Sequence, residues 1–257
     1  MWALLLLAAA IAGWWHHRRR PAARRSRHRT LQRTTTALRH TIRRRPQHGA
    51  GASADAHARH LSGGLRNHLA AAVGITTRSH RQAANYRAGA EGERRTAALL
   101  APLAERGWTF LDDRALPSRR SRTNLDHLAI SPTGAVVLLD SKAWDCRYPL
   151  TVRRRRALHG RQDVTGRLSA LAYETRTVSA TLGVPVIPLV VMHGAPLHGQ
   201  DGQPASELSL SGFRVRIIPA DRIVAVLRSL DPSTTRTRAA QALAARARHQ
   251  FPPHTHH

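Results

Sequence analysis

Apolar residues recur in regular patterns from about residue 82 to residue 230 of the 257-residue chain. Spacings of three and four residues from Tyr86 to Leu103, and again from Val164 to Leu182, predict two amphipathic helices. Gly183 is placed to end the second helix. Short apolar runs bounded by turn residues predict strands at 108–111, 123–130, 135–142, 185–192 and 213–218. With a last helix expected at 220–230, the pattern indicates an α/β domain.

The second and third predicted strands are joined by a turn that decides which side chains share a face. A three-residue loop at 132–134, with glycine in the left-handed conformation, pairs Ile130 with Val136. That register places Asp126 opposite Asp140. A two-residue loop would put the two aspartates on opposite faces of the sheet. The three-residue loop therefore predicts a pair of carboxylates on one face.

Lys142 is the only lysine in the chain, and arginine supplies every other cation apart from the histidines. A lysine ammonium can approach a single oxygen and shift its pKa, which a guanidinium cannot do. Lys142 and Asp140 lie two residues apart at the end of an apolar run, so in a strand they point to the same face. This pairing favours a functional site over an ion pair that only caps the strand.

Glu93 lies on the inward stripe of the first predicted helix. A carboxylate that faces the core needs a partner or a metal ion. Alternatively, Gly92 marks a late helix start, and backbone N–H groups of the first turn satisfy Glu93. The sequence favours neither interpretation. In the first one, Glu93 and the two aspartates form an oxygen-rich site suited to a hard divalent cation such as magnesium.

Three stretches resemble motifs of the nuclease-related domain family, NERD, within the PD-(D/E)xK nuclease superfamily. They are Gly-Ala-Glu-Gly-Glu at 89–93, Asn-Leu-Asp-His-Leu at 124–128, and the run at 134–144 that holds Asp-Ser-Lys and ends in tryptophan. The resemblance implies a restriction-endonuclease-like mixed β-sheet flanked by helices. It also implies catalytic or metal-binding roles for four residues, which are Glu93, Asp126, Asp140 and Lys142.

The N-terminal segments predict attachment to a membrane. Residues 1–15 are apolar and uncharged, although shorter than the roughly 20 residues of a full transmembrane helix. An arginine block follows at 18–20, which predicts an outside N-terminus and a cytoplasmic body. Residues 16–80 form a basic, low-complexity tether that could bind either anionic lipid or nucleic acid. The ordered domain is expected at 81–232, followed by a basic tail at 233–257 with a weak helix at 238–248.

Charge indicates a polyanionic partner. The formal net charge is +26, and no acidic residue precedes Asp55. Arginines at 153–156 follow a further strand-like run at 148–152 and would form a basic rim beside the site, suited to phosphate contacts. A merely solvated charge run is the alternative. Cys146 is the sole cysteine, which excludes an intrachain disulfide and a cysteine zinc cluster.

Together these features predict a membrane-tethered nuclease that depends on Mg²⁺ or Mn²⁺ and cleaves DNA in preference to RNA. Asp126 and Asp140 would hold the metal, and Glu93 would complete its ligands. Lys142 would position the attacking water or stabilise the transition state. The alternative is a non-catalytic protein that binds nucleic acid or anionic membranes and retains a nuclease-like core.

Overall fold

A mixed six-stranded sheet forms the centre of the computed structural model, which describes residues 49–52, 54–56, 58, 78–117, 124–198 and 206–254. The strand order is β1-β2-β3-β7-β10-β9. The strands are β1 (Thr109–Ala115), β2 (Asn124–Ile130), β3 (Val136–Ala143), β7 (Val186–His193), β9 (Ser206–Leu210) and β10 (Phe213–Pro219). β3, β7 and β10 run parallel, and the outer pairs are antiparallel. The predicted α/β class with a mixed sheet is confirmed.

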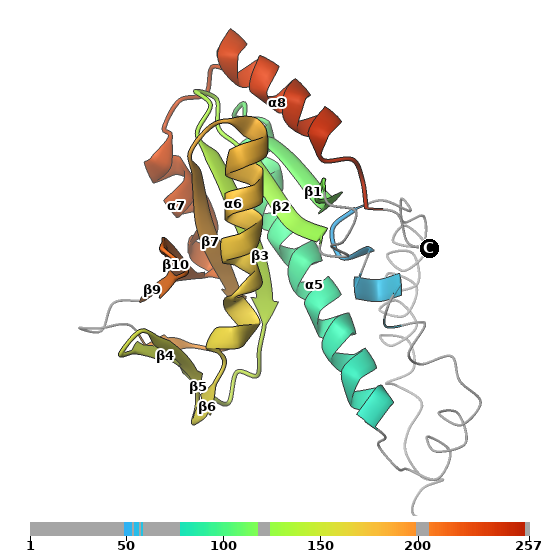
Figure 1. Cartoon of the computed structure of the whole chain (residues 1–257), viewed down its shortest axis with the longest axis vertical. Coiled ribbons are helices and arrows are strands. Elements are labelled where there is room, and N and C mark those ends of the chain that lie inside the picture. Colours follow the sequence, from blue (N-terminus) through green and yellow to red (C-terminus); the bar gives the residue numbers. More distant parts are fainter. Residues whose placement is uncertain are drawn as a thin grey trace, which may run out of the picture. The chain divides into compact units, whose positions relative to one another are not determined.

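Helices cover both faces of this sheet (Figure 1). They are α5 (Arg78–Ala104), α6 (Ala170–Leu182), α7 (Ile223–Leu230) and α8 (Arg238–Gln250), with short 3₁₀ helices η2 (Thr165–Leu168) and η4 (Ala220–Arg222). α5 and α7 pack in one apolar cluster with the side chains of Val137 and Leu139. α6 and α8 pack in the other with Val136 and Leu138. Successive side chains of β3 point to opposite faces, so this strand contributes residues to the apolar cluster on each side of the sheet.

A second, four-stranded sheet stands at the carboxyl ends of β3 and β7. Its order is β6-β5-β4-β8, from β4 (Leu150–Arg153), β5 (Arg156–His159), β6 (Gln162–Asp163) and β8 (Leu197–His198). β4 follows β3 along the chain, and β8 follows β7 and pairs with β4 in parallel. Figure 1 shows this small sheet beyond the end of the central sheet that is opposite α8.

Most elements fall where the apolar pattern predicts them, with three informative differences. α5 begins at Arg78, so Glu93 lies in the middle of the helix and the helix-start interpretation of this residue is wrong. The predicted helix at 164–182 is divided into η2 and α6, and Gly183 ends it with a φ of 64°. The weak helix expected at 238–248 in the tail is α8, and it packs on the domain, where it buries Leu243, Ala244 and Ala247.

The membrane predictions rest on residues that the structure does not describe. The predicted anchor at 1–15 lies outside the described residues, as does most of the predicted tether at 16–80. Among the helices that are described, none combines the length and apolar character needed to cross a bilayer.

The β2–β3 turn has the predicted geometry. Ile130 pairs with Val136, and Gly134 has a φ of 105°. Asp231 anchors the turn from the loop after α7, because its carboxylate accepts hydrogen bonds from Thr133 N (2.9 Å) and Thr133 Oγ1 (2.7 Å). The same carboxylate accepts a third bond from Ser233 N at 2.9 Å. Asp231 therefore holds the turn that sets the register of β2 against β3.

Replacing Asp231 with asparagine tests this anchor. Burial acts to raise the pKa of Asp231, but hydrogen bonds from Ser131, Thr133 and Ser233 hold it at about 2. Because the folded pKa lies below the unfolded one, the carboxylate adds stability above about pH 4 that is lost as pH falls through 2. We expect Asp231→Asn to lower the free energy of unfolding by about 2 kcal/mol at pH 7.

The measurement is denaturant unfolding of wild type and variant between pH 7 and pH 3. The difference in free energy of unfolding between the two should narrow as pH falls. The control Asp221→Asn, at an exposed position, should unfold with the wild-type free energy. A difference that stays constant over this range would contradict the anchor.

Candidate functional site

Three of the four residues singled out from sequence share one face of the sheet. On β2 and β3, Leu128 and Leu138 face the cluster that contains α6. Continuing the alternation by two residues puts Asp126, Asp140 and Lys142 on this same face. The observed register ends at His127 opposite Leu139. Continued by one residue along each strand, it puts Asp126 opposite Asp140. The predicted one-face arrangement follows from this register.

Asp140 and Lys142 form an ion pair at the end of β3. Beside it, Ser141 N donates a hydrogen bond of 2.9 Å to Asp126 Oδ2, which ties β2 to β3 at this point. Although burial acts to lower it, the carboxylates of Asp140 and Asp126 raise the pKa of Lys142 above its ordinary value. The ammonium therefore stays charged at all physiological pH values.

Burial and neighbouring charges raise the pKa values of three carboxyl groups near Lys142. Burial first, and then the charges of Glu93 and Asp140, raise the pKa of Asp126 well above its ordinary range. Glu93 is only 6 % exposed, and burial is the main cause that raises its pKa to about 7. Glu93 reaches this group from α5, which packs against the opposite face of the sheet. The site thus holds more buried carboxyl groups than Lys142 can neutralise, and part of them keep a proton near neutral pH.

Glu174 on α6 is a further carboxylate of this group that was not predicted from the sequence. It is 7 % exposed, and burial, followed by the charges of Asp140 and Asp126, raises its pKa to about 8. A sequence signal existed, because Glu174 lies three residues after Leu171 and four before Val178 on the apolar stripe. An inward glutamate at such a position is the same signal that drew attention to Glu93.

The donor chemistry of this group fits a hard divalent cation. Carboxylate oxygens are the preferred ligands of magnesium, and here four carboxylates surround one lysine. As the side chains stand, however, no three acidic, histidine or cysteine residues within the described ranges are grouped so that they could hold a metal ion. Their oxygens accept bonds from within the chain instead, as with Asp140 and Lys142.

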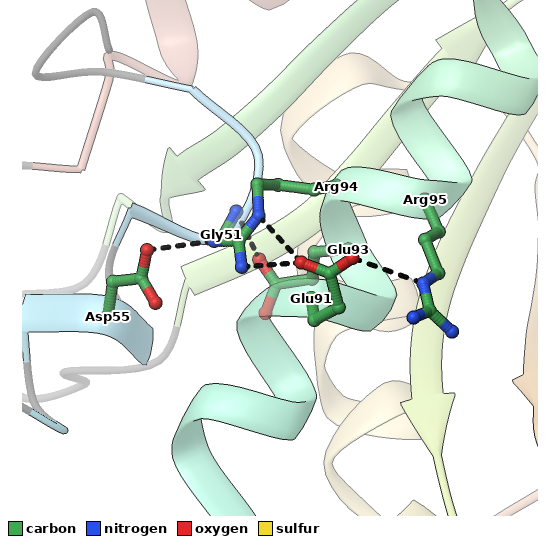
Figure 2. Close-up of polar contacts among 6 residues, drawn as sticks. All are labelled: Gly51, Asp55, Glu91, Glu93, Arg94 and Arg95. Carbon is green, nitrogen blue, oxygen red and sulfur yellow. Dashed lines mark hydrogen bonds and ion pairs between the residues drawn. The ribbon is translucent and has the colours of Figure 1, made fainter. Parts of the chain in front are cut away.

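Residues 49–58 supply one of these internal donors to Glu93. Gly51 N donates a hydrogen bond of 2.8 Å to Glu93 Oε2 (Figure 2). Alongside, Arg94 bridges Asp55 (2.8 Å) and Glu91 (2.7 Å). A Cβ on Gly51, whose φ is 77°, would lie 2.4 Å from the carbonyl oxygen of Ala90. Only glycine therefore allows this segment to approach α5 and reach Glu93.

Hydrogen bonds on the opposite face fix α5 against the ends of β3 and β7. Ser141 Oγ donates to Thr96 Oγ1 at 2.8 Å, and Thr96 Oγ1 shares a hydrogen bond of 2.8 Å with His193 Nε2. Gly92 allows close contact, since a Cβ there would lie 3.2 Å from that of Ala143. Because Thr96 is three residues from Glu93, this network sets the position of Glu93 near the end of β3.

The comparisons with known proteins support the resemblance seen in the three motifs. Residues 88–193 match the family model of the nuclease-related domain, NERD. The matched segment runs from α5 to β7 and includes Lys142 and the four carboxylates near it, which are Glu93, Asp126, Asp140 and Glu174. Neither the curated proteins nor the solved structures include a significant match to the chain.

Glu174→Gln tests whether this carboxyl is buried in the site. Because its pKa in the folded chain, about 8, lies above the unfolded value, folding favours the protonated form and wild-type stability is lost as pH rises from about 4.5 through 8. The neutral amide avoids this loss. In metal-free buffer we expect equal stability at pH 5 and a variant more stable by a few kcal/mol at pH 9, on the order expected from the linkage.

Thermal or denaturant unfolding at the two pH values measures this difference. The control is Glu207→Gln, which changes an exposed glutamate on β9 and should leave both values unchanged. A Glu174→Gln variant that is no more stable at pH 9 than at pH 5, relative to wild type, would refute the burial of this carboxyl.

Gly51→Ala tests the contact between residues 49–58 and Glu93. The added Cβ overlaps Ala90, so the backbone N–H of residue 51 should lose its hydrogen bond to Glu93. We expect its hydrogen to exchange with deuterium roughly ten- to a hundredfold faster than in wild type. Gly89→Ala is the matched control on α5, because a Cβ there meets nothing within 4 Å. Equal exchange in the two variants would show that Gly51 is not held at Glu93.

Proposed function

We propose that this chain, whose residues 88–193 form a nuclease-related domain, is a metal-dependent nuclease that hydrolyses phosphodiester bonds of DNA. The observation that carries the proposal is Lys142, held charged beside Asp140 at the end of β3 among carboxylates from three other elements. A fixed cation next to an oxygen-rich group suits a reaction in which negative charge develops on a phosphate.

The charged state of Lys142 limits its role in this reaction. An ammonium with a raised pKa cannot accept the proton of the attacking water, so Lys142 acts as a donor to a phosphate oxygen or to that water. The proton of that water therefore passes to another acceptor than Lys142.

Asp126, Asp140 and Glu93 would hold the divalent cation, Mg²⁺ or Mn²⁺. Their oxygens match its ligand preference, and Glu174 lies close enough to interact electrostatically with Asp140 and Asp126. When bound, the cation supplies charge neutralisation and polarisation of the phosphodiester. The internal donors Gly51 and Lys142 would then share these carboxylates with it.

We further propose that the protein acts at the cytoplasmic face of a membrane. The proposal rests on the apolar residues 1–15 and on the arginine block that follows at 18–20. The net charge of +26 supports a polyanionic substrate, for which DNA is the proposed form.

The test incubates the full chain with supercoiled, linear and single-stranded DNA, and with RNA, with or without Mg²⁺ or Mn²⁺. Wild type should cut DNA only with metal, and Lys142→Ala or Asp140→Asn should be at least about a hundredfold slower. Lys142→Arg should not restore the rate, because a planar guanidinium cannot replace a compact ammonium. Gel electrophoresis of the products gives the rates.

Glu207→Gln on β9 is the control, since it removes an exposed carboxylate away from Lys142 and should cut at the wild-type rate. Wild type that cuts no substrate with either metal, or site variants that cut as fast as wild type, would leave the non-catalytic binding protein as the better description.

A further inference from the structure

The β4–β5 hairpin carries four consecutive exposed arginines, residues 153–156. Arg153 pairs with Arg156, so Arg154 and Arg155 form a two-residue loop. Their φ values are 48° and 64°, a conformation that asparagine and glycine adopt with far less strain. The tip of this hairpin thus holds two arginines where the turn itself favours other residues. Strained backbone of this kind points to a function for the side chains.

The charges at this tip are not used to hold the fold together. Within the described ranges, Arg154 and Arg155 take part in no ion pair, and Arg156 only approaches Asp163 at 3.8 Å with both side chains exposed. Among the described residues, the side chains of Arg154 and Arg155 are therefore not neutralised by a local carboxylate. A polyanion is the kind of partner that such a surface attracts.

The hairpin is fixed to the end of the sheet that carries Lys142. Trp144 N donates to His193 O at 3.0 Å, and Leu150 N donates to Pro196 O at 2.8 Å, so the segments after β3 and β7 are joined. Leu150 also lies in the same apolar cluster as Leu138. These contacts fix the small sheet at the carboxyl ends of β3 and β7 (Figure 1).

Aromatic rings lie at the base of the hairpin. Tyr148 is 50 % exposed and meets His159 edge to face, and His159 in turn packs on Trp144. The guanidinium of Arg147 lies 5.9 Å from the centre of the Tyr148 ring. An exposed ring beside arginines offers stacking to a base as well as contacts to phosphates.

We propose that the β4–β5 hairpin binds the phosphate backbone of the nucleic acid. Arg154 and Arg155 make the main contacts, and Tyr148 at the base of the hairpin offers its ring for stacking. Arginine suits this role because its guanidinium forms paired hydrogen bonds to phosphate oxygens. The inference rests on the proposed function for the identity of the substrate. Binding itself requires no hydrolysis, so the two can be tested apart.

Cys146, the only cysteine and exposed, allows a local test in the full chain. It is labelled with an azidophenacyl photocrosslinker and irradiated with fluorescent duplex DNA in EDTA, where a metal-dependent enzyme cannot cut. The double variant Arg154→Asn/Arg155→Gly removes two charges and places residues that favour positive φ in the loop. We expect the crosslink yield to fall about tenfold near 0.1 M salt, while stability stays equal or rises.

The control is Arg238→Gln/Arg248→Gln, which removes the same charge from exposed positions on α8, at the other end of the sheet (Figure 1). It should retain the wild-type yield. Equal yields in wild type and hairpin variant, or an equal loss in the control, would overturn the proposal. A hairpin variant that is less stable than wild type would overturn the argument from backbone strain.

Two further outcomes separate this inference from its alternatives. If the hairpin variant crosslinks DNA normally but no longer binds phosphatidylserine vesicles, the surface serves a membrane and the proposal fails. If wild type crosslinks DNA through the hairpin but cuts none with Mg²⁺ or Mn²⁺, the hairpin proposal stands and the nuclease proposal fails.

Discussion

An excess of buried carboxyl groups over cations at the end of β3 is the constraint on which the rest of this structure depends. Several carboxylates from four elements gather around a single ammonium, and burial makes their full ionisation costly. The chain meets this cost with Lys142, with backbone donors from Ser141 and Gly51, and with raised pKa values. A cation that approaches these carboxyl groups favours their ionised form. The arrangement that costs folding free energy is therefore also one that favours binding of a cation.

The parts of this site that lie on neighbouring strands could be predicted from sequence. Asp126 and Asp140 follow from the two-residue period of strands and the loop length that Gly134 sets, since both are local properties of the chain. The period of the apolar residues predicts the first helix in the same way. Gly183, which favours the left-handed conformation, marks the end of α6. The family match over 88–193 covers the stretch where these local patterns are clearest.

The remaining parts depend on contacts that leave little trace in local composition. Gly51 meets Glu93 through a backbone N–H across 42 residues of sequence, and a backbone donor carries no residue-type signal. A weak helix was expected where α8 lies, but its apolar stripe consists largely of alanine between arginines, so its packing against the domain left little signal. Glu174 differs from both, since its inward helical position was visible in the pattern but has meaning only once α6 is packed beside β3.

The uniqueness of Lys142 has a consequence for how this chain can be cut. A lysine-specific protease finds one target bond in the 257 residues, between Lys142 and Ala143. Both residues are paired with β7, opposite Met192 and His193, so the bond is out of reach while β3 and β7 stay joined. Fraying of the chain ends and loops therefore does not expose this bond to the protease. The rate at which the protease cuts the chain measures how often the central sheet opens.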